Sequence, residues 1–124
     1  MSRINQPNPK RGEIWFVQFS PQVGSELGSP HPALVVSRDD VGVLPLRIVV
    51  PITSWQQRFS IVPWMLEIKA NSTNGLKNRS VADCFQTRSF DVERFMSRWG
   101  ELDSATLAQV TQIVAEVIGV KFDE

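Results

Sequence analysis

The chain contains one histidine, His31, and this is the side chain best suited to exchange protons near neutral pH. It stands between Pro30 and Pro32 in residues 24–37, GSELGSPHPALVVS, where a polar, turn-rich loop runs into an apolar segment. An unperturbed imidazole has a pKa of about 6.5, so it can accept or donate a proton in a reaction. The pattern predicts an imidazole at the tip of a stiffened loop, beside a buried strand. The alternative is an exposed loop residue that only happens to neighbour a proline.

Metal and nucleotide chemistry are not indicated by the other residues. One histidine and one cysteine cannot assemble a usual zinc site, and no pair of carboxylates has a spacing that indicates a Mg²⁺ site. The glycines of GSELG have neither the spacing nor the Lys-Ser/Thr ending of a phosphate-binding P-loop. We therefore expect no metal and no cofactor.

The elements that must position His31 are predicted from the apolar patterns around it. Segments rich in β-branched and aromatic residues, separated by turn residues, are typical of strands. Five strands are expected, at residues 13–19, 32–37, 46–54, 64–70 and 79–87. We expect a flexible tail at residues 1–9, a loop at residues 54–63, and one short helical turn within residues 90–100.

The C-terminal part of the chain predicts one amphipathic helix. Apolar residues recur there at the helical spacing, at Leu107, Val110, Val114 and Val117. Asp103 or Ser104 can cap the N-terminus of this helix, and Gly119 can end it. Short connections and one closing helix predict a mainly β fold, a small, strongly curved antiparallel sheet or barrel with the helix packed on it.

Length, charge and cysteine content restrict the class of protein. The 124 residues fit a single domain, which we place at residues 10–124. The 13 basic and 13 acidic side chains cancel, so a nucleic acid would have to be attracted by a local basic groove. Cys84 cannot pair within the chain, and no signal peptide or membrane-spanning apolar stretch is visible. We therefore expect a cytoplasmic protein without membrane contact.

Four motifs in chain order resemble the MazF/PemK family of toxin endoribonucleases. They are KRGE before the first strand, GSE in the loop before His31, PITS at the end of the third strand, and the Gln-x-Arg of FQTRSFD. The resemblance covers about residues 10–120. It implies an SH3-like small antiparallel β-barrel with a C-terminal α-helix, as in CcdB/PemK-like toxins, and a homodimer. It also implies metal-free cleavage of single-stranded RNA and a cognate protein antitoxin.

The resemblance places His31 and Thr53 at the catalytic positions. Metal-free cleavage uses the ribose 2′-OH as the nucleophile on the adjacent phosphate, so it requires a base, an acid and donors to the phosphoryl oxygens. Family members carry arginine where this chain has His31. Arginine holds phosphate well and exchanges protons poorly, whereas histidine does the reverse. Thr53 can donate its hydroxyl to a phosphoryl oxygen, although threonine also favours strands for packing reasons.

Further residues are implied to contact RNA. These candidates are Glu26, Ser54, Gln86, Arg88, Arg11 and Arg58. The Gln86 amide can read a base edge, while a solvated charge is the alternative for Glu26 and a structural role the alternative for Arg88. Most other basic residues, Lys77 among them, are interpreted as solvated surface charges.

These observations predict the toxin of a type II toxin-antitoxin system. It is expected to cleave mRNA selectively and to leave 2′,3′-cyclic phosphate and 5′-hydroxyl ends, because the attacking oxygen belongs to the RNA. Two alternatives stay open. One is a gyrase-poisoning toxin of the same fold, which needs neither His31 nor Thr53. The other is a catalytically silent relative that only binds an antitoxin.

Overall fold

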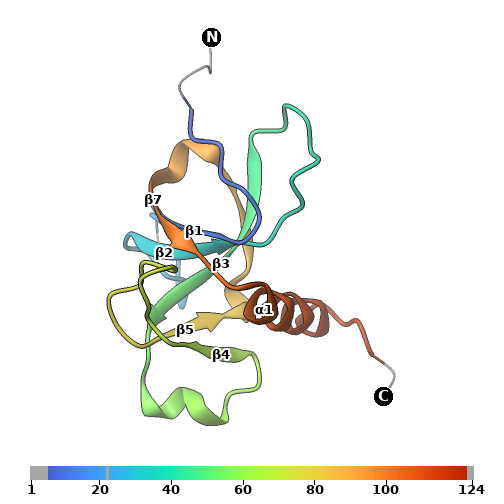
Figure 1. Ribbon diagram of the computed structural model, residues 1–124. Coiled ribbons are helices and arrows are strands. Elements are labelled where there is room, and N and C mark those ends of the chain that lie inside the picture. Colours follow the sequence, from blue (N-terminus) through green and yellow to red (C-terminus); the bar gives the residue numbers. More distant parts are fainter. Residues whose placement is uncertain (1–5, 22, 123–124) are drawn as a thin grey trace.

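The structure is a computed structural model that describes residues 6–21 and 23–122. Within these residues, seven strands form an antiparallel sheet and one α-helix packs against it (Figure 1). The strands are β1 (Glu13–Val17), β2 (His31–Val35), β3 (Leu46–Ser54), β4 (Met65–Ile68), β5 (Ser80–Asp83), β6 (Arg88–Asp91) and β7 (Phe95–Glu101). The helix is α1 (Ser104–Val117), and the short 3-10 helices are η1 (Gln57–Ile61), η2 (Cys84–Gln86) and η3 (Val92–Arg94).

The central strand β3 is shared between several partners. Residues 46–49 of β3 pair with β6, and residues 52–54 pair with β5, while β2 pairs along the middle. The neighbours run β4-β5-β3-β2-β1-β7, and no ladder between described residues joins β4 to β7. The expected mainly β fold with a C-terminal helix is confirmed, but the sheet is not closed into a barrel.

The two edge strands of the sheet, β4 and β7, are linked by a backbone contact instead of a ladder. The turn between β4 and β5 reaches the end of β7, and the Glu101 N–H donates to the Thr73 carbonyl at 3.0 Å. A glycine is required on each side of this contact, because an added Cβ at Gly75 would collide with the Trp99 carbonyl and one at Gly100 with the Thr73 carbonyl. The turn is thus packed directly on the backbone of β7.

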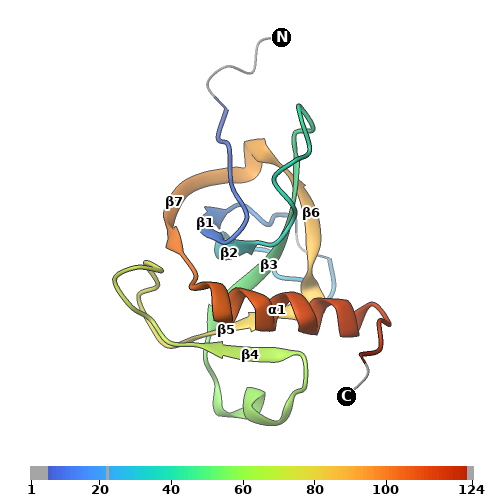
Figure 2. The same cartoon turned by 45° about the vertical axis from the view of Figure 1, so that its right-hand side comes forward.

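Two apolar clusters use alternate residues of the strands, as the two-residue period of a strand requires. The first includes Ile14, Leu34, Val50, Ile52, Ala82 and Val110. The second includes Val17, Phe19, Ala33, Val35, Val49, Phe90 and Phe95. The first cluster lies under α1, which crosses the sheet beside β4 and β5 (Figure 2). Residues of β1, β2 and β3 are therefore buried in one cluster or the other, which holds these three strands in place.

The helix α1 follows the prediction closely. The predicted stripe packs on the first cluster through Leu107, Val114 and Val117, with Val110 fully buried. Asp103 is the N-cap, since its carboxylate accepts from the Thr106 N–H at 2.9 Å. The helix therefore begins and ends where its capping residues and periodicity indicate.

The segment between residues 79 and 101 differs most from the prediction. Of the expected strand at residues 79–87, only β5 is extended, and the rest turns into η2. The expected helical turn exists as η3, but it separates two strands, β6 and β7, that were not predicted. In β7 only Phe95 and Gly100 are buried, so this strand lacks the alternation that identifies a half-buried strand. The predicted loop at residues 54–63 likewise contains η1.

The segment before β1 lies against a buried arginine. Residues 1–5 of the expected flexible tail lie outside the described residues. Arg47 is 9% exposed, and its Nε donates to the Pro9 carbonyl at 2.8 Å. Its guanidinium also donates to Asn8 Oδ1 at 3.0 Å and to the Leu44 carbonyl at 2.9 Å. Residues 8 and 9 are therefore held on the sheet by Arg47.

Candidate active site

A cavity of about 180 Å³ lies where β2 begins and β3 ends. It is lined by His31, Pro32, Ile52, Thr53, Ser54, Leu76, Lys77, Asn78, Ser80 and Trp99. The structure thus brings together three of the predicted site residues, His31, Thr53 and Ser54. They come from neighbouring strands, while the opposite wall is formed by the turn before β5 and by β7.

The register of β2 and β3 explains why His31 and Thr53 share this cavity. Ala33 of β2 is paired with Pro51 of β3 in an antiparallel ladder. Continuing this register by two residues sets His31 opposite Thr53, on the same face of the sheet. The two side chains are therefore placed by the central strands of the fold.

His31 is the first residue of β2, with Val17 as its partner on β1. The prediction of a loop tip is wrong in this respect, because the β1–β2 ladder extends to His31 and continues past Pro32. The Ser29 Oγ lies 3.1 Å from His31 Nε2, and the Phe19 ring meets the imidazole edge-to-face at 5.9 Å between centroids. Partial burial lowers the pKa of His31 below its ordinary value. The imidazole is therefore mainly neutral at neutral pH.

The second wall of the cavity contains polar groups that no sequence motif marks. Lys77, Asn78 and Ser80 lie there, after the Asn-Gly turn of NSTNGLKN. Their sequence signal was only that of a turn with surface charges. Their position beside His31 depends on the packing of this turn on β7, which no local pattern records.

Gln86, Glu26 and Arg88 line a different cavity, of about 310 Å³, together with Phe85 and Thr87. The Gln86 side chain is already engaged, because its Oε1 accepts from the Leu27 N–H at 3.0 Å and its Nε2 donates to Asp83 Oδ2 at 2.9 Å. Gln86 therefore connects the loop before β2 to η2. The Arg88 guanidinium stacks over the Phe90 ring, 4.4 Å from its centroid.

Arg11 and Arg58 lie apart from both cavities. The Arg11 guanidinium donates to the Val36 carbonyl and to Thr111 Oγ1, the latter at 3.0 Å, so it joins the end of β2 to α1. Arg58 belongs to η1, where its Nε donates to Gln56 Oε1 at 2.8 Å. Neither side chain is among the residues that line the His31 cavity or the Gln86 cavity.

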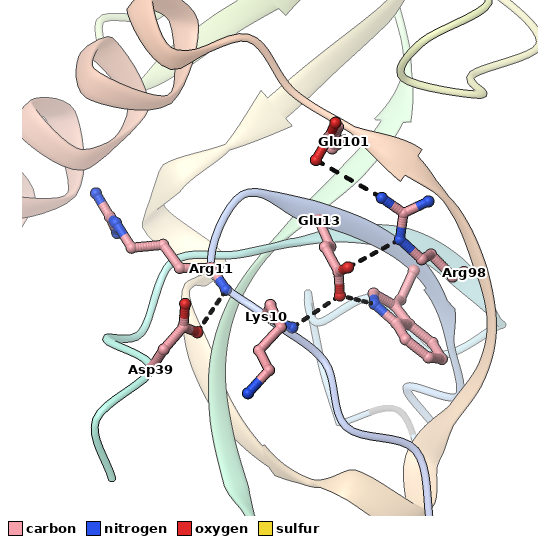
Figure 3. A network of polar contacts seen from close by, with 7 residues as sticks. Lys10, Arg11, Glu13, Asp39, Arg98 and Glu101 are labelled. Carbon is pink, nitrogen blue, oxygen red and sulfur yellow. Dashed lines mark hydrogen bonds and ion pairs between the residues drawn. The ribbon is translucent and has the colours of Figure 1, made fainter.

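The acidic residue of the KRGE motif organises the junction of β1 and β7 (Figure 3). Glu13 accepts from the Lys10 N–H at 2.8 Å, from Trp15 Nε1 at 3.0 Å and from Arg98 Nε at 2.8 Å. Burial alone would raise the pKa of Glu13, but these hydrogen bonds and the Arg98 charge lower it overall. Glu13 is therefore a charged structural residue that ties three segments together.

Two further findings concern metals and membranes. In the described part of the chain, no three of the His, Cys, Asp and Glu side chains gather in a way that could hold a metal ion. None of the helices described is long and apolar enough to cross a membrane.

Comparison with known proteins places this arrangement in a family. Residues 10–118 match the model described as PemK-like, MazF-like toxin of type II toxin-antitoxin system. The endoribonuclease MazF9 of Mycobacterium tuberculosis is 35% identical over 109 residues, which cover 83% of this chain and 90% of that protein.

Solved structures give the same result. A crystal structure of MazF from Deinococcus radiodurans has a TM-score of 0.78 and 27% identity, and covers 92% of this chain and 99% of that one. A crystal structure of MazE-MazF from the same organism has a TM-score of 0.70 and 26% identity, with 93% of this chain and 100% of that one covered. The open antiparallel sheet with its C-terminal helix is thus a MazF-type toxin fold. The chain belongs to the PemK-like, MazF-like toxin family of type II toxin-antitoxin systems.

Proposed function

We propose that the chain is a metal-independent endoribonuclease that cleaves single-stranded RNA, mRNA in particular, at selected sequences. The observation that carries this proposal is the shared cavity of His31 and Thr53, which sets a proton-exchanging group beside a hydroxyl donor on two adjacent strands. The relative MazF9 is named an endoribonuclease, which supports the same reaction.

The reaction would use a nucleophile that the RNA itself provides. His31, mainly neutral at neutral pH, takes the proton of the ribose 2′-OH as the O2′–P bond forms. Thr53 donates its hydroxyl hydrogen to a phosphoryl oxygen, where negative charge develops. The P–O5′ bond then breaks and the 5′ oxygen takes a proton from solvent water. The products are a 2′,3′-cyclic phosphate and a 5′-hydroxyl end.

Base selection is proposed for the Gln86 cavity. Glu26 and Arg88 line it together with Phe85, whose side chain is 60% exposed. An exposed aromatic ring can stack on an unpaired base, and charged side chains can bind base edges or phosphate. Gln86 supports this cavity, because its side chain holds the loop that carries Glu26.

Two protein partners are part of the proposal. The family is defined by type II toxin-antitoxin systems, and the MazE-MazF crystal structure shows that relative with MazE, so we expect a cognate antitoxin here. A homodimer is supported by apolar side chains left exposed after α1, at Ile118, Val120 and Phe122. An mRNA substrate would place the activity in the cytoplasm.

The test is to incubate the purified protein with a long RNA in the presence of EDTA and to map the products. Cleavage at recurrent short sequences with cyclic phosphate ends is the expected result. Products with 5′-phosphate ends that require Mg²⁺ would contradict the mechanism. Inhibition of a gyrase without RNA cleavage would identify the gyrase-poisoning alternative, and neither activity would indicate a protein that only binds an antitoxin.

A further inference from the structure

The cavity is lined by one basic side chain that the reaction above does not use, Lys77. We propose that Lys77 binds the scissile phosphate and supplies the positive charge that arginine, at the position of His31, provides in other family members. This inference rests on the proposed function, because it needs RNA in the cavity. It makes Lys77 a catalytic residue on the wall opposite His31.

The charges around the cavity support this assignment. None of the described residues that line it is acidic, and its polar side-chain groups besides Lys77 are hydroxyls, one amide, one imidazole and the indole N–H of Trp99. Because the imidazole of His31 is mainly neutral at neutral pH, it cannot neutralise a phosphate in the resting protein. An ammonium group can do so, and Lys77 is the lysine that lines this cavity.

Lys77 is also free to bind an anion. Other basic side chains of the described residues are engaged by carboxylates, for example Arg79 by Glu67 and Arg98 by Glu13. Lys77 has no ion pair among the described residues. Its Nζ lies instead 5.1 Å from the centroid of the Trp99 ring, a weak contact that leaves its hydrogen-bond donors available.

The Trp99 contact directs the lysine toward the cavity. Trp99 lines the cavity together with Lys77, and its ring is stacked on Phe16, with 5.1 Å between centroids and 7° between planes. A ring held by a neighbouring strand cannot rotate freely. It therefore acts as a fixed platform along which the lysine side chain lies.

The turn that carries Lys77 is held in place by two asparagines. Asn74 is 2% exposed, and its Oδ1 accepts from the Asn71 N–H at 3.1 Å and from the Leu76 N–H at 3.0 Å. Its Nδ2 donates to the Lys69 carbonyl at 2.9 Å. With Gly75 packed against the Trp99 carbonyl, the backbone before Lys77 has little freedom to move. A rigid support of this kind places a flexible lysine reproducibly.

The test compares Lys77→Met, which removes the charge and keeps an unbranched side chain of nearly the same length, with Lys77→Arg, which keeps the charge. Lys69→Met is the matched control, because Lys69 belongs to the same turn and does not line this cavity. The substrate is a short RNA that contains the mapped cleavage site. A second RNA carries a 2′-deoxynucleotide there, which prevents cleavage and allows binding to be measured. A third carries, in addition, a neutral methylphosphonate at that linkage.

We expect Lys77→Met to cleave about 10²-fold more slowly than the wild type, the usual effect of losing one donor to a developing oxyanion. Its binding of the uncleavable RNA should depend less on salt, with a slope of log affinity against log salt smaller by about 0.7. Lys77→Arg should retain most of the activity, and Lys69→Met should behave as the wild type. With the methylphosphonate, wild type and Lys77→Met should bind equally.

Two results would overturn the assignment while leaving the proposed function intact. One is a Lys77→Met variant that cleaves at the wild-type rate. The other is a binding defect that persists with the methylphosphonate, since Lys77 would then act elsewhere. Thermal unfolding of each variant shows whether the fold is retained, and Lys77→Gln replaces Lys77→Met if it is not. Failure of the wild type itself to cleave or bind RNA would instead overturn the proposed function.

Discussion

The Leu27 N–H donates to Gln86 Oε1 at 3.0 Å, which connects the loop before β2 to η2 across 59 positions of the chain. Because Gln86 Nε2 also donates to Asp83, the amide acts as a bridge between loop and sheet. Gln86→Ala should lower the free energy of unfolding by about 1 kcal/mol, because it leaves two partly buried polar groups without their partner. It should also make the loop at residues 23–30 more sensitive to proteases. Unchanged stability with altered cleavage sites would show instead that the amide reads a base.

The pH dependence of cleavage tests the role of His31. If neutral His31 is the base, the rate falls as the pH drops through its pKa, which burial sets below the ordinary value of about 6.5. His31→Ala should lose about 10²- to 10⁴-fold in rate. In His31→Arg the remaining rate should show little pH dependence between about pH 5 and 8, because a guanidinium stays protonated and can stabilise phosphoryl charge but cannot take the 2′-OH proton. A wild-type rate that falls on the alkaline side would assign His31 as the acid, and an unaffected His31→Ala would make it a bystander.

Substitutions at Thr53 separate its hydroxyl from its place in β3. Thr53→Ser keeps the hydroxyl and should retain most of the cleavage rate. Thr53→Val keeps the branched shape and should lose about 10²-fold, as expected for one donor to the phosphoryl oxygens. Measuring the rates of both variants beside their unfolding curves makes the comparison direct. Equal rates for the serine and valine variants would argue that Thr53 only packs in the strand.

The lowered pKa of Glu13 has a consequence for stability in acid. A carboxyl whose pKa is lower in the folded chain stabilises it above the unfolded value of about 4.3, and this contribution is lost as the pH falls through the folded pKa. Glu13→Gln should therefore lower the free energy of unfolding by about 1 to 2 kcal/mol at pH 7. The difference from the wild type should shrink at pH 3. Urea unfolding at both pH values measures it, and a constant difference would contradict the charged role.

The proposed homodimer predicts a concentration-dependent mass in solution. Sedimentation at micromolar concentration should show twice the mass of the chain. Replacing the exposed Ile118 by Glu should shift the equilibrium toward the monomer, if the apolar residues after α1 form the contact. Val43→Glu is the control, since Val43 is fully exposed on the loop before β3. A single monomeric species for the wild type at all concentrations would contradict the dimer.

The core of the candidate site could be predicted from the sequence, because its strands are marked by local patterns. The apolar runs of β2 and β3 were identified at residues 32–37 and 46–54, within one or two residues of their observed bounds. Two such strands pair next to each other, so a histidine before the first and a threonine near the end of the second become neighbours. The stripe of α1 and its N-cap were predictable for the same local reasons.

The remaining parts depend on contacts between distant segments. β7 has a mostly exposed sequence and forms a strand because β1 pairs with it, not because its own residues alternate. Lys77 carries no local signal that distinguishes it from other surface lysines, and Arg11 donates to Thr111 of α1, which lies 100 positions away in the chain. Such placements follow from the tertiary structure and are not encoded in a short window of sequence.

The packing of the β4–β5 turn on β7 also limits which substitutions this protein can accept during evolution. Glycines at positions 75 and 100 are held by backbone atoms on the other side of the contact, so substitution there displaces the whole turn. The Asn78 side chain is exposed on the same turn, and exchanging it leaves the contact intact. Mutation can thus vary the cavity wall at position 78 while the wall itself and Lys77 keep their places, so the proposed RNA preference could change through this position.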